Sequence, residues 1–312
     1  MTTSELPSAA TVLVTGATGT HGRTGQRVVD QLLAATLNVR VLVRRESAKS
    51  DELRALGAEI HVGDLHNRAS LLGALDGVQG AYFTYPIAGG IVSAAGNFAS
   101  AIRALDIAPR VVVMSMGPSS PDSPSHLGRA AALAEEIMGW SGINPTVLRV
   151  AGFFFENIGL LHAQTIKSHG VIRNNFGDGA APWISGQDSA DLGVAALLRP
   201  ELFAERSIHY LPGAELLSHL EIAKALAAEL DRSVEFESIS REQWHAELVE
   251  LAASGDGAVN TDMAAHISNL GSVLGSGKAP RLVPDAARLE ALLGRPPMTF
   301  ADYLHSQRDV FV

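Results

Sequence analysis

Cysteine is absent from the 312 residues of this chain. Disulfide bonds, thiolate metal sites and thiol nucleophiles are therefore excluded. Basic runs are absent too: 24 lysines and arginines stand against 33 acidic residues, which gives a formal net charge of −9. Nucleic acid and anionic membranes attract dense positive charge. We therefore expect neither of them as a partner.

Long apolar runs are also missing. No stretch approaches the roughly 18 to 20 apolar residues that span a bilayer, and the first apolar run, "TVLVTG", is too short for the core of a secretion signal. The 11 histidines show no H-E-x-x-H or other metal-ligand spacing, and no G-x-S-x-G hydrolase motif is present. We expect a cytoplasmic protein without a metal site.

What the chain does have is the alternation of an α/β protein. Short β-branched runs alternate with segments whose apolar residues recur at helical spacing. Continuous apolar strands separated by helices indicate a parallel sheet with helices on both faces. The predicted strands are 11–16, 38–44, 58–64, 80–86, 110–116 and 145–152.

The pattern loosens in the second half of the chain. We predict a Rossmann-type, doubly wound NAD(P)-binding domain over residues 1–152 and a smaller, mainly helical substrate-binding lobe over 153–312. Residues of about 186–213 are expected to return to the first domain, and 207–213 to add a strand to its sheet.

Three local patterns refine the second half. Asp188 is interpreted as a helix N-cap, and Ser218 and Glu221 have the spacing of a capping box. The glycine-rich stretch 271–280 predicts a loop.

A glycine-rich stretch, "TGATGTHGRTGQRVV", follows the first predicted strand and precedes a predicted helix. This is the context of a dinucleotide-binding turn, in which bare backbone N–H groups at a helix N-terminus bind pyrophosphate. A plain glycine turn without a ligand is the alternative. The predicted ligands in the turn are Gly16, Thr18, Gly19, Thr20, Gly22 and Gly25.

Two glycines compete for the third position of the motif, where the helix packs closely on the strand. Gly25 stands three residues before the apolar pair 28–29, which is the usual register. A helix begun at Gly22 would keep a similar face, but it would enclose Gly25 at a cost of about 1 kcal/mol relative to alanine. We prefer Gly25, so that residues 21–23 lengthen the loop beside the phosphates.

The end of the second predicted strand selects the cofactor. An enzyme that prefers NAD places an acidic residue there to bind the ribose hydroxyls. This chain has Arg44 followed by Arg45. A guanidinium matches the 2′-phosphate of NADP(H), so we expect that cofactor, with Arg44 as its ligand and Arg45 solvated. Arg23 is a weaker candidate for the same phosphate.

With "VTGATG", "VRVLVRR", "VGDL" and "TVLRVAGFFFEN" in this order, the chain resembles the NmrA-like group of atypical short-chain dehydrogenases. This group includes NADPH-dependent quinone oxidoreductases, triphenylmethane-dye reductases and NADP-binding regulators. The resemblance implies that Asp64 and Leu65 border the adenine. It also implies that Thr84, Tyr85 and Pro86 lie along the cofactor toward the nicotinamide.

The same resemblance places the opening of the substrate lobe at "FFFEN", with Asn157 near the pocket. For Phe153 to Phe155, packing between the lobes and lining of the pocket are equally favoured. A flat apolar pocket for a planar substrate could be supplied by Tyr85, Phe153 and Trp183.

The resemblance fails at the catalytic residues. Short-chain dehydrogenases use a Tyr-x-x-x-Lys pair to exchange a proton, but here these positions fall near Leu127 and Ala131. His126 and Ser115 are weak candidates in their place. The adjacent Glu135 and Glu136 form no acid–base pair by spacing.

The sequence therefore predicts an NADPH-dependent oxidoreductase that transfers hydride directly to a planar electrophile such as a quinone, dye or azo compound. Such electrophiles need no protein acid, because the cofactor carries the chemistry and water protonates the product. The missing pair equally supports an alternative, an NADP(H)-binding redox sensor that acts through a protein partner. A homodimer is compatible with both. A nucleotide-sugar epimerase or dehydratase is disfavoured.

Overall fold

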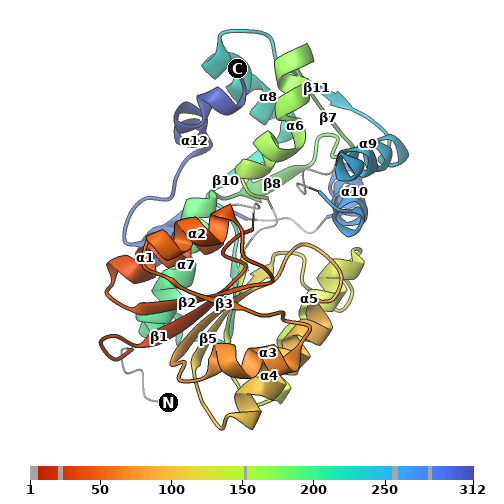
Figure 1. The fold of residues 1–312 in the computed structure, drawn as a ribbon. Helices are drawn as coiled ribbons and strands as arrows, with labels where there is room; N and C mark the ends of the chain where they lie inside the picture. Colours follow the sequence, from red (N-terminus) through yellow and green to blue (C-terminus); the bar gives the residue numbers. More distant parts are fainter. Residues whose placement is uncertain (1–5, 20–23, 151–152, 255–258, 280–282) are drawn as a thin grey trace.

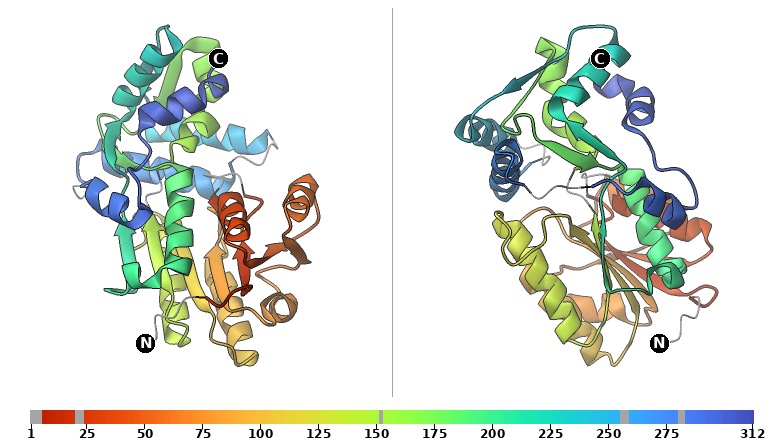
Figure 2. Two further views of the ribbon diagram at one scale, coloured as in Figure 1. Left: turned by 90° about the vertical axis from the view of Figure 1, so that its left-hand side faces the viewer. Right: turned by 180° about the vertical axis from the view of Figure 1, so that it is seen from behind.

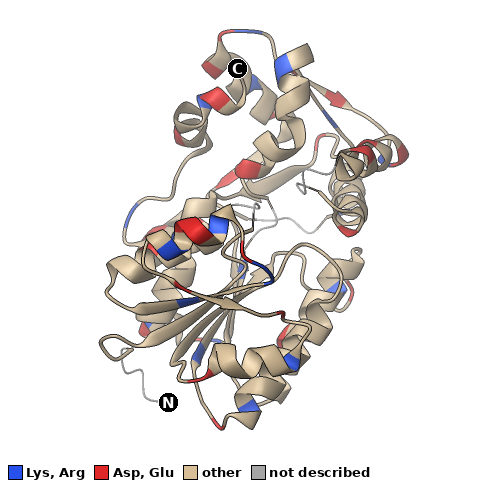
Figure 3. Ribbon diagram, in the orientation of Figure 1, with Lys and Arg blue, Asp and Glu red and all other residues tan. Residues whose placement is uncertain are grey.

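The computed structural model describes residues 6–19, 24–150, 153–254, 259–279 and 283–312. Two lobes are stacked on each other (Figure 1), one built on a large sheet and the other carrying the C-terminus. Acidic and basic residues are interspersed over both lobes in the view of Figure 3.

The first lobe is built on a parallel sheet of seven strands in the order β3-β2-β1-β4-β5-β6-β9. The six predicted strands are present, and β9 confirms the strand expected at 207–213. Chain order reverses between β1 and β4, which is where doubly wound folds bind their ligands. The strands are β1 (Thr11–Thr15), β2 (Asn38–Val43), β3 (Glu59–Val62), β4 (Gly80–Thr84), β5 (Arg110–Met116), β6 (Thr146–Val150) and β9 (Ile208–Leu211).

Helices cover both faces of this sheet because alternate strand residues point to opposite sides. In β1, Val12 and Val14 belong to one core cluster and Leu13 to the other. The first cluster lies beneath α1 (Thr24–Ala34), α2 (Ala48–Ala55), α7 (Gly186–Leu198) and α11 (Ala286–Leu293). The second lies beneath α3 (Arg68–Leu75), α4 (Ile91–Ala104) and α5 (His126–Trp140). Helices α1 and α7 pack side by side (Figure 2).

The second lobe surrounds an apolar core rich in aromatic side chains. It contains two small sheets, β10–β8 antiparallel and β11–β7 parallel. Its strands are β7 (Val171–Asn174), β8 (Ala180–Trp183), β10 (Glu215–Ser218) and β11 (Glu235–Ser238). Its helices are α6 (Glu156–His169), α8 (His219–Leu230), α9 (Arg241–Ala253), α10 (Thr261–Gly275) and α12 (Phe300–Ser306). Short 3₁₀ helices occupy Pro200–Phe203 and Arg308–Val310.

The predicted capping box of α8 is confirmed, but the N-cap assigned to Asp188 is wrong. Ser185 caps α7 and accepts a hydrogen bond from the Asp188 amide at 2.9 Å. The Asp188 carboxylate is instead buried, where it lies 2.7 Å from Arg295 and accepts from the Met298 amide at 2.9 Å. Asp188 thus fastens the segment before α12 onto α7.

The prediction of a loop at 271–280 is also wrong in its first half, because α10 continues to Gly275. Its glycines serve close packing. A Cβ atom on Gly271 would lie 2.1 Å from Asn175 Oδ1, and one on Gly275 would lie 2.9 Å from the Asn175 carbonyl oxygen. Tertiary contact has overridden the turn propensity of glycine at these positions.

Two histidines, His162 and His219, are buried side by side in the second lobe. Burial disfavours the charged imidazolium and lowers the pKa of His162 from 6.5 to about 3. Burial, together with the neighbouring His162, also lowers the pKa of His219. Both rings are therefore neutral in the folded protein at neutral pH.

We expect the free energy of unfolding to fall as the pH is lowered below 6.5. The unfolded chain binds a proton at His162 near pH 6.5 whereas the folded chain binds it near pH 3. His162 alone should remove about 2 kcal/mol of stability between pH 6.5 and 5. The H162F variant, which keeps a ring against Trp244, should show a smaller pH slope in urea unfolding. The exposed H169Q control should keep the wild-type slope, and equal slopes for H162F and wild type would contradict this assignment.

Candidate functional site

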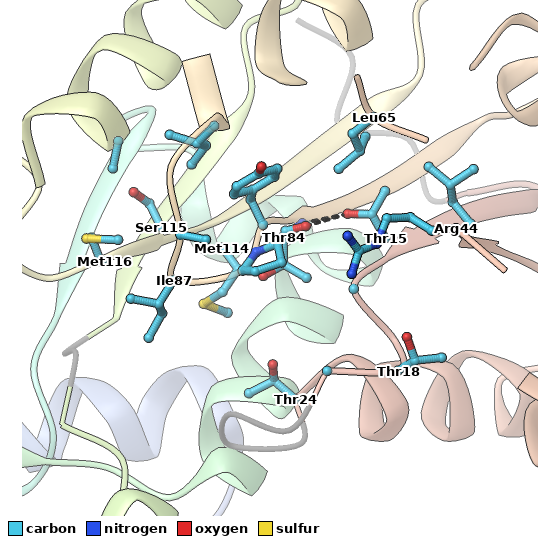
Figure 4. Close-up of a pocket in the computed structure, with 18 of the residues that line it drawn as sticks. Thr15, Thr18, Thr24, Arg44, Leu65, Thr84, Ile87, Met114, Ser115 and Met116 are labelled. Atoms are coloured by element: carbon cyan, nitrogen blue, oxygen red, sulfur yellow. Dashed lines mark hydrogen bonds between the residues drawn. The ribbon is translucent and has the colours of Figure 1, made fainter. Parts of the chain in front are cut away.

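A cavity of about 450 Å³ opens at the carboxyl edge of the large sheet. Its walls come from the residues at the ends of β1 to β6, together with the start of α5 and Asn260 just before α10. Figure 4 shows the two ends of this cleft, with Arg44 and Leu65 at one end and Ser115 and Met116 at the other.

The turn after β1 forms the floor of the cleft. Gly16 has a positive φ of 70°, and a Cβ atom there would lie 2.5 Å from Thr84 Cγ2. The Gly19 amide donates to the Gly16 carbonyl at 3.0 Å. The Thr15 hydroxyl donates to the Thr84 carbonyl at 2.7 Å and accepts from the Thr84 amide at 2.9 Å (Figure 4). The ends of β1 and β4 are thereby locked together under the turn.

Helix α1 approaches this turn closely at Gly25. A Cβ atom on Gly25 would lie 2.7 Å from both the Gly16 oxygen and the Ala17 Cα atom. Gly25 therefore has the geometry expected of the third glycine. Thr20, Gly22 and the whole segment 21–23 lie outside the described residues, so their predicted roles stay predictions.

The turn fits a pyrophosphate group on two observations. Side chains are excluded at Gly16 and Gly25 by direct contact with backbone or with Thr84, so the backbone stays bare where a ligand would approach. The 11-residue helix α1 begins beside the turn and carries no acidic residue in its first turn. Its N-terminus adds a favourable field for an anion. Thr18 also lines the cavity.

A cationic pair marks the outer end of the cleft. Arg44 and Arg45 are both exposed, but only Arg44 lines the cavity. Lys49 of α2 leans over the turn and donates from Nζ to the Thr18 carbonyl at 3.3 Å. The sequence interpretation missed Lys49, although its position in the first turn of the helix that follows Arg44 was a usable signal. Together these two cations can bind a phosphate monoester.

Asp64 and Leu65 line the cavity after β3, as does His66, which the sequence interpretation missed. The His66 amide donates to Asp64 Oδ1 at 2.9 Å. The ring of His66 lies 2.8 Å from the Tyr85 hydroxyl, which donates to the Gly89 carbonyl at 2.9 Å. Burial, with Asp64 adding to it, raises the pKa of Tyr85. Tyr85 therefore stays protonated at neutral pH and holds the loop after β4 in place.

The inner end of the cleft is predominantly apolar. Leu127 and Ala131, which stand near the positions of the missing catalytic pair, both line it. Ser115 and Asn260 are polar exceptions among the described lining residues. The remaining lining side chains of this end are Ile87, Met114, Met116, Val150 and Phe154.

Ser115 is joined to a buried ion pair. Its hydroxyl donates to Glu135 Oε1 at 2.5 Å, and Arg149 Nη2 lies 2.5 Å from Glu135 Oε2. Glu135 is only 6% exposed, while Glu136 next to it faces solvent. Sequence spacing did not indicate this pair, because Arg149 comes from the next strand of the sheet rather than from the same helix.

His126 is not among the residues that line the cavity. Its Nε2 atom lies 3.6 Å from Asp262 Oδ1, and Asp262 also accepts from the Gly89 amide at 2.8 Å. The His126 side chain therefore bridges α5 to the start of α10. Of the two catalytic candidates, the structure brings only Ser115 to the cleft.

Phe153, Asn157 and Trp183 are not brought to this cavity either. Trp183 is buried in the second lobe, where its Nε1 atom donates to the Leu217 carbonyl at 3.0 Å. The Phe153 ring lies 5.4 Å from the Trp183 ring, and Asn157 is buried on α6. Phe154, the residue that follows Phe153, lines the cavity instead. The place of Phe153 in the substrate pocket therefore stays a prediction, because this cavity is lined by its neighbour Phe154.

The described residues contain neither a membrane-spanning helix nor a metal-binding cluster. No helix in that part of the chain is long and apolar enough to cross a membrane. No group of three or more histidine, aspartate and glutamate side chains there is placed to hold a metal ion.

The parallel sheet, the reversal of strand order and the glycine turn define a Rossmann-type nucleotide-binding protein. The model of the NmrA-like family matches residues 8–304, so the chain belongs to this family. It is 32% identical to an NAD(P)H azoreductase of Xenophilus azovorans over 237 residues, which cover 74% of this chain and 78% of that protein.

Solved structures share the fold. An NADPH-dependent quinone oxidoreductase of Escherichia coli complexed with NADPH superposes with a TM-score of 0.76 at 23% identity, covering 95% of this chain and 99% of that one. A triphenylmethane reductase of Citrobacter sp. complexed with NADP(H) gives 0.74 at 20% identity, covering 96% and 99%.

Substituting Gly25 by alanine tests the close approach of α1 to the turn. Because the new Cβ atom would meet backbone at 2.7 Å, we expect G25A to lower the free energy of unfolding by about 1–3 kcal/mol. G96A is the matched control, since Gly96 lies in α4 with nothing within 4 Å of its added Cβ atom. That control should gain about 0.5–1 kcal/mol. Urea denaturation measures both, and a stabilised G25A would contradict the packing described.

Proposed function

We propose that this protein is an NADPH-dependent oxidoreductase that transfers hydride to a planar electrophile such as a quinone, a dye or an azo compound. One observation carries the proposal. A single cleft joins a glycine turn and Arg44 to an apolar end about Leu127 and Ala131, and Lys49 contacts the same turn at the Thr18 carbonyl. The first part suits an NADP(H) cofactor, and the second suits a flat apolar acceptor.

The relatives support the same chemistry. The azoreductase is named for NAD(P)H, and the quinone oxidoreductase and the triphenylmethane reductase were solved with NADPH and NADP(H). Azo compounds, quinones and triphenylmethane dyes are all conjugated, largely apolar acceptors of hydride. The apolar inner end of this cleft is compatible with any of them.

We assign the cofactor contacts by their place along the cleft. Gly16, Gly19 and the N-terminus of α1 would hold the pyrophosphate, with Thr18 beside them and Thr20 and Gly22 completing the turn. Arg44 and Lys49 would bind the 2′-phosphate. Asp64 and Leu65 would border the adenine, and Thr84, Tyr85 and Pro86 would lie along the middle of the cofactor. Gly25 acts through packing alone.

The chain's own residues leave proton transfer to solvent. When bound, NADPH supplies a hydride, which carries both electrons of the reduction. Leu127 and Ala131 cannot donate a proton, so the acceptor gains its proton from water after it has received the hydride. The apolar walls orient the ring and limit water at the reacting face. Acceptors that must be protonated first, such as simple ketones, should react poorly.

The first test is turnover. Purified protein with NADPH and a panel of quinones, triphenylmethane dyes and azo dyes should consume the reduced cofactor, with NADH much less effective. Loss of absorbance at the reduced nicotinamide band measures the rate. Tight NADPH binding without turnover on any acceptor would contradict the reductase and favour the redox-sensor alternative, which should bind a protein partner differently with NADP⁺ and with NADPH.

The second test concerns cofactor choice. We expect R44A to raise the dissociation constant for NADPH by about 10- to 100-fold, the effect of removing a charged hydrogen bond to phosphate. K49A should act in the same direction, and binding of NADH should be unchanged in both. R45A is the matched control, because Arg45 carries the same charge next to Arg44 without lining the cavity, whereas Lys49 contacts the Thr18 carbonyl of the turn. Titration of protein fluorescence measures the dissociation constants of both cofactors for wild type and the three variants, and equal losses for R44A and R45A would count against the assignment.

A further inference from the structure

Ser115 lies at the inner end of the cleft in a fixed set of hydrogen bonds. Its Oγ atom lies 2.5 Å from Glu135 Oε1 and 3.0 Å from Ser119 Oγ. Arg149 holds the carboxylate from the far side, with Nε at 3.0 Å and Nη2 at 2.5 Å from Oε2. Glu135 and Ser119 are buried, whereas Ser115 reaches the cavity.

The direction of these bonds follows from the inventory of donors. The Glu135 carboxylate, paired with the Arg149 guanidinium, can only accept hydrogen bonds. Ser115 has one proton, and the short contact commits that proton to Glu135. Ser119 must then be the donor in its contact with Ser115. A hydroxyl oxygen has two lone pairs, so one lone pair of Ser115 is left for the cavity.

The second polar residue at this end has its own partners. Asn260 Nδ2 donates to the Ile87 carbonyl at 3.0 Å, and its Oδ1 atom accepts from the Met263 amide at 2.9 Å. Asn260 therefore holds the loop after β4 and caps α10. Ser115 is left as the group at the inner end that can be directed at a ligand.

We infer that Glu135, held by Arg149, accepts the hydrogen bond that the Ser115 hydroxyl donates. Ser115 therefore faces the cleft as a hydrogen-bond acceptor. The ligand group it selects is an N–H or O–H donor. Glu135 is a positioning residue here, because it acts through Ser115. The inference rests on the proposed function, since the donor belongs to either the carboxamide of the nicotinamide or the reducible acceptor.

This orientation has a chemical consequence. A hydroxyl whose proton is committed to Glu135 cannot donate to a carbonyl oxygen of the acceptor before hydride transfer. Ser115 therefore does not replace the missing tyrosine as an acid. It holds a donor-bearing ligand in place, while the proton that completes the reduction comes from water.

The experiment has a binding arm and a turnover arm. The binding arm compares dissociation constants for NADPH and for its 3-acetylpyridine analogue, in which the carboxamide N–H donors are replaced by a methyl group. The turnover arm compares KM values for a hydroxylated quinone and for its methyl ether. Both arms use wild type, S115A and E135Q, with E136Q as the matched control because Glu136 is exposed on the same helix.

In wild type we expect a preference of about fivefold for the donor-bearing ligand in one arm, the effect of one hydrogen bond. Preference in the binding arm assigns the donor to the carboxamide, and preference in the turnover arm assigns it to the acceptor. S115A should abolish that preference and E136Q should keep it. In E135Q the glutamine amide can donate to Ser115, which frees the serine proton, so the preference should vanish or reverse.

The inference is overturned if wild type shows no preference in either arm, or if S115A keeps the preference. Thermal unfolding checks that E135Q is folded, and S115A answers the question by itself if E135Q is not. Failure of the proposed function is distinct, because it appears as wild-type protein that neither binds nor oxidises NADPH. A preference in the binding arm upholds the inference even where no acceptor is turned over.

Discussion

The closeness of two backbone segments, the first turn of α1 and the turn after β1, governs the rest of the cleft. Gly25 touches the carbonyl of Gly16 at a distance that leaves no room for a Cβ atom. This contact fixes the position of α1 relative to the turn, and thereby where the positive end of the helix dipole acts. Thr15 and Thr84 then fix β4 against the same turn. The cofactor cleft is shaped by backbone packing before any side chain of the site takes part.

Much of the first lobe could be predicted because its signals are local. Strand and helix periodicity placed the strands, and the glycine spacing placed the turn and identified Gly25. The position of Arg44 relative to the end of β2 is equally local. Asp64 and Tyr85, which the family resemblance placed along the cofactor, line the cleft because the carboxyl ends of parallel strands meet at one edge.

The missing parts depend on distant packing. Glu135 and Arg149 are 14 residues apart and come from a helix and a strand, so their spacing in the sequence does not predict the pair. Phe154 lines the cleft whereas Phe153 packs against Trp183, and three consecutive phenylalanines give no sequence signal that distinguishes one from the next. Glycines in α10 imitate a loop in sequence, yet they serve contact with Asn175.

The sheet is completed by a segment that the chain delivers late. β9 pairs with β6 only after α6, β7, β8 and α7 have intervened. On the ribosome, the outer edge of β6 and the apolar face beneath α7 therefore stay uncovered until residues 186–211 have emerged. Open strand edges of this kind invite pairing with other chains. A fragment that ends at β6 would keep that edge open permanently, because α7 and β9 of the first lobe come from the second half of the chain.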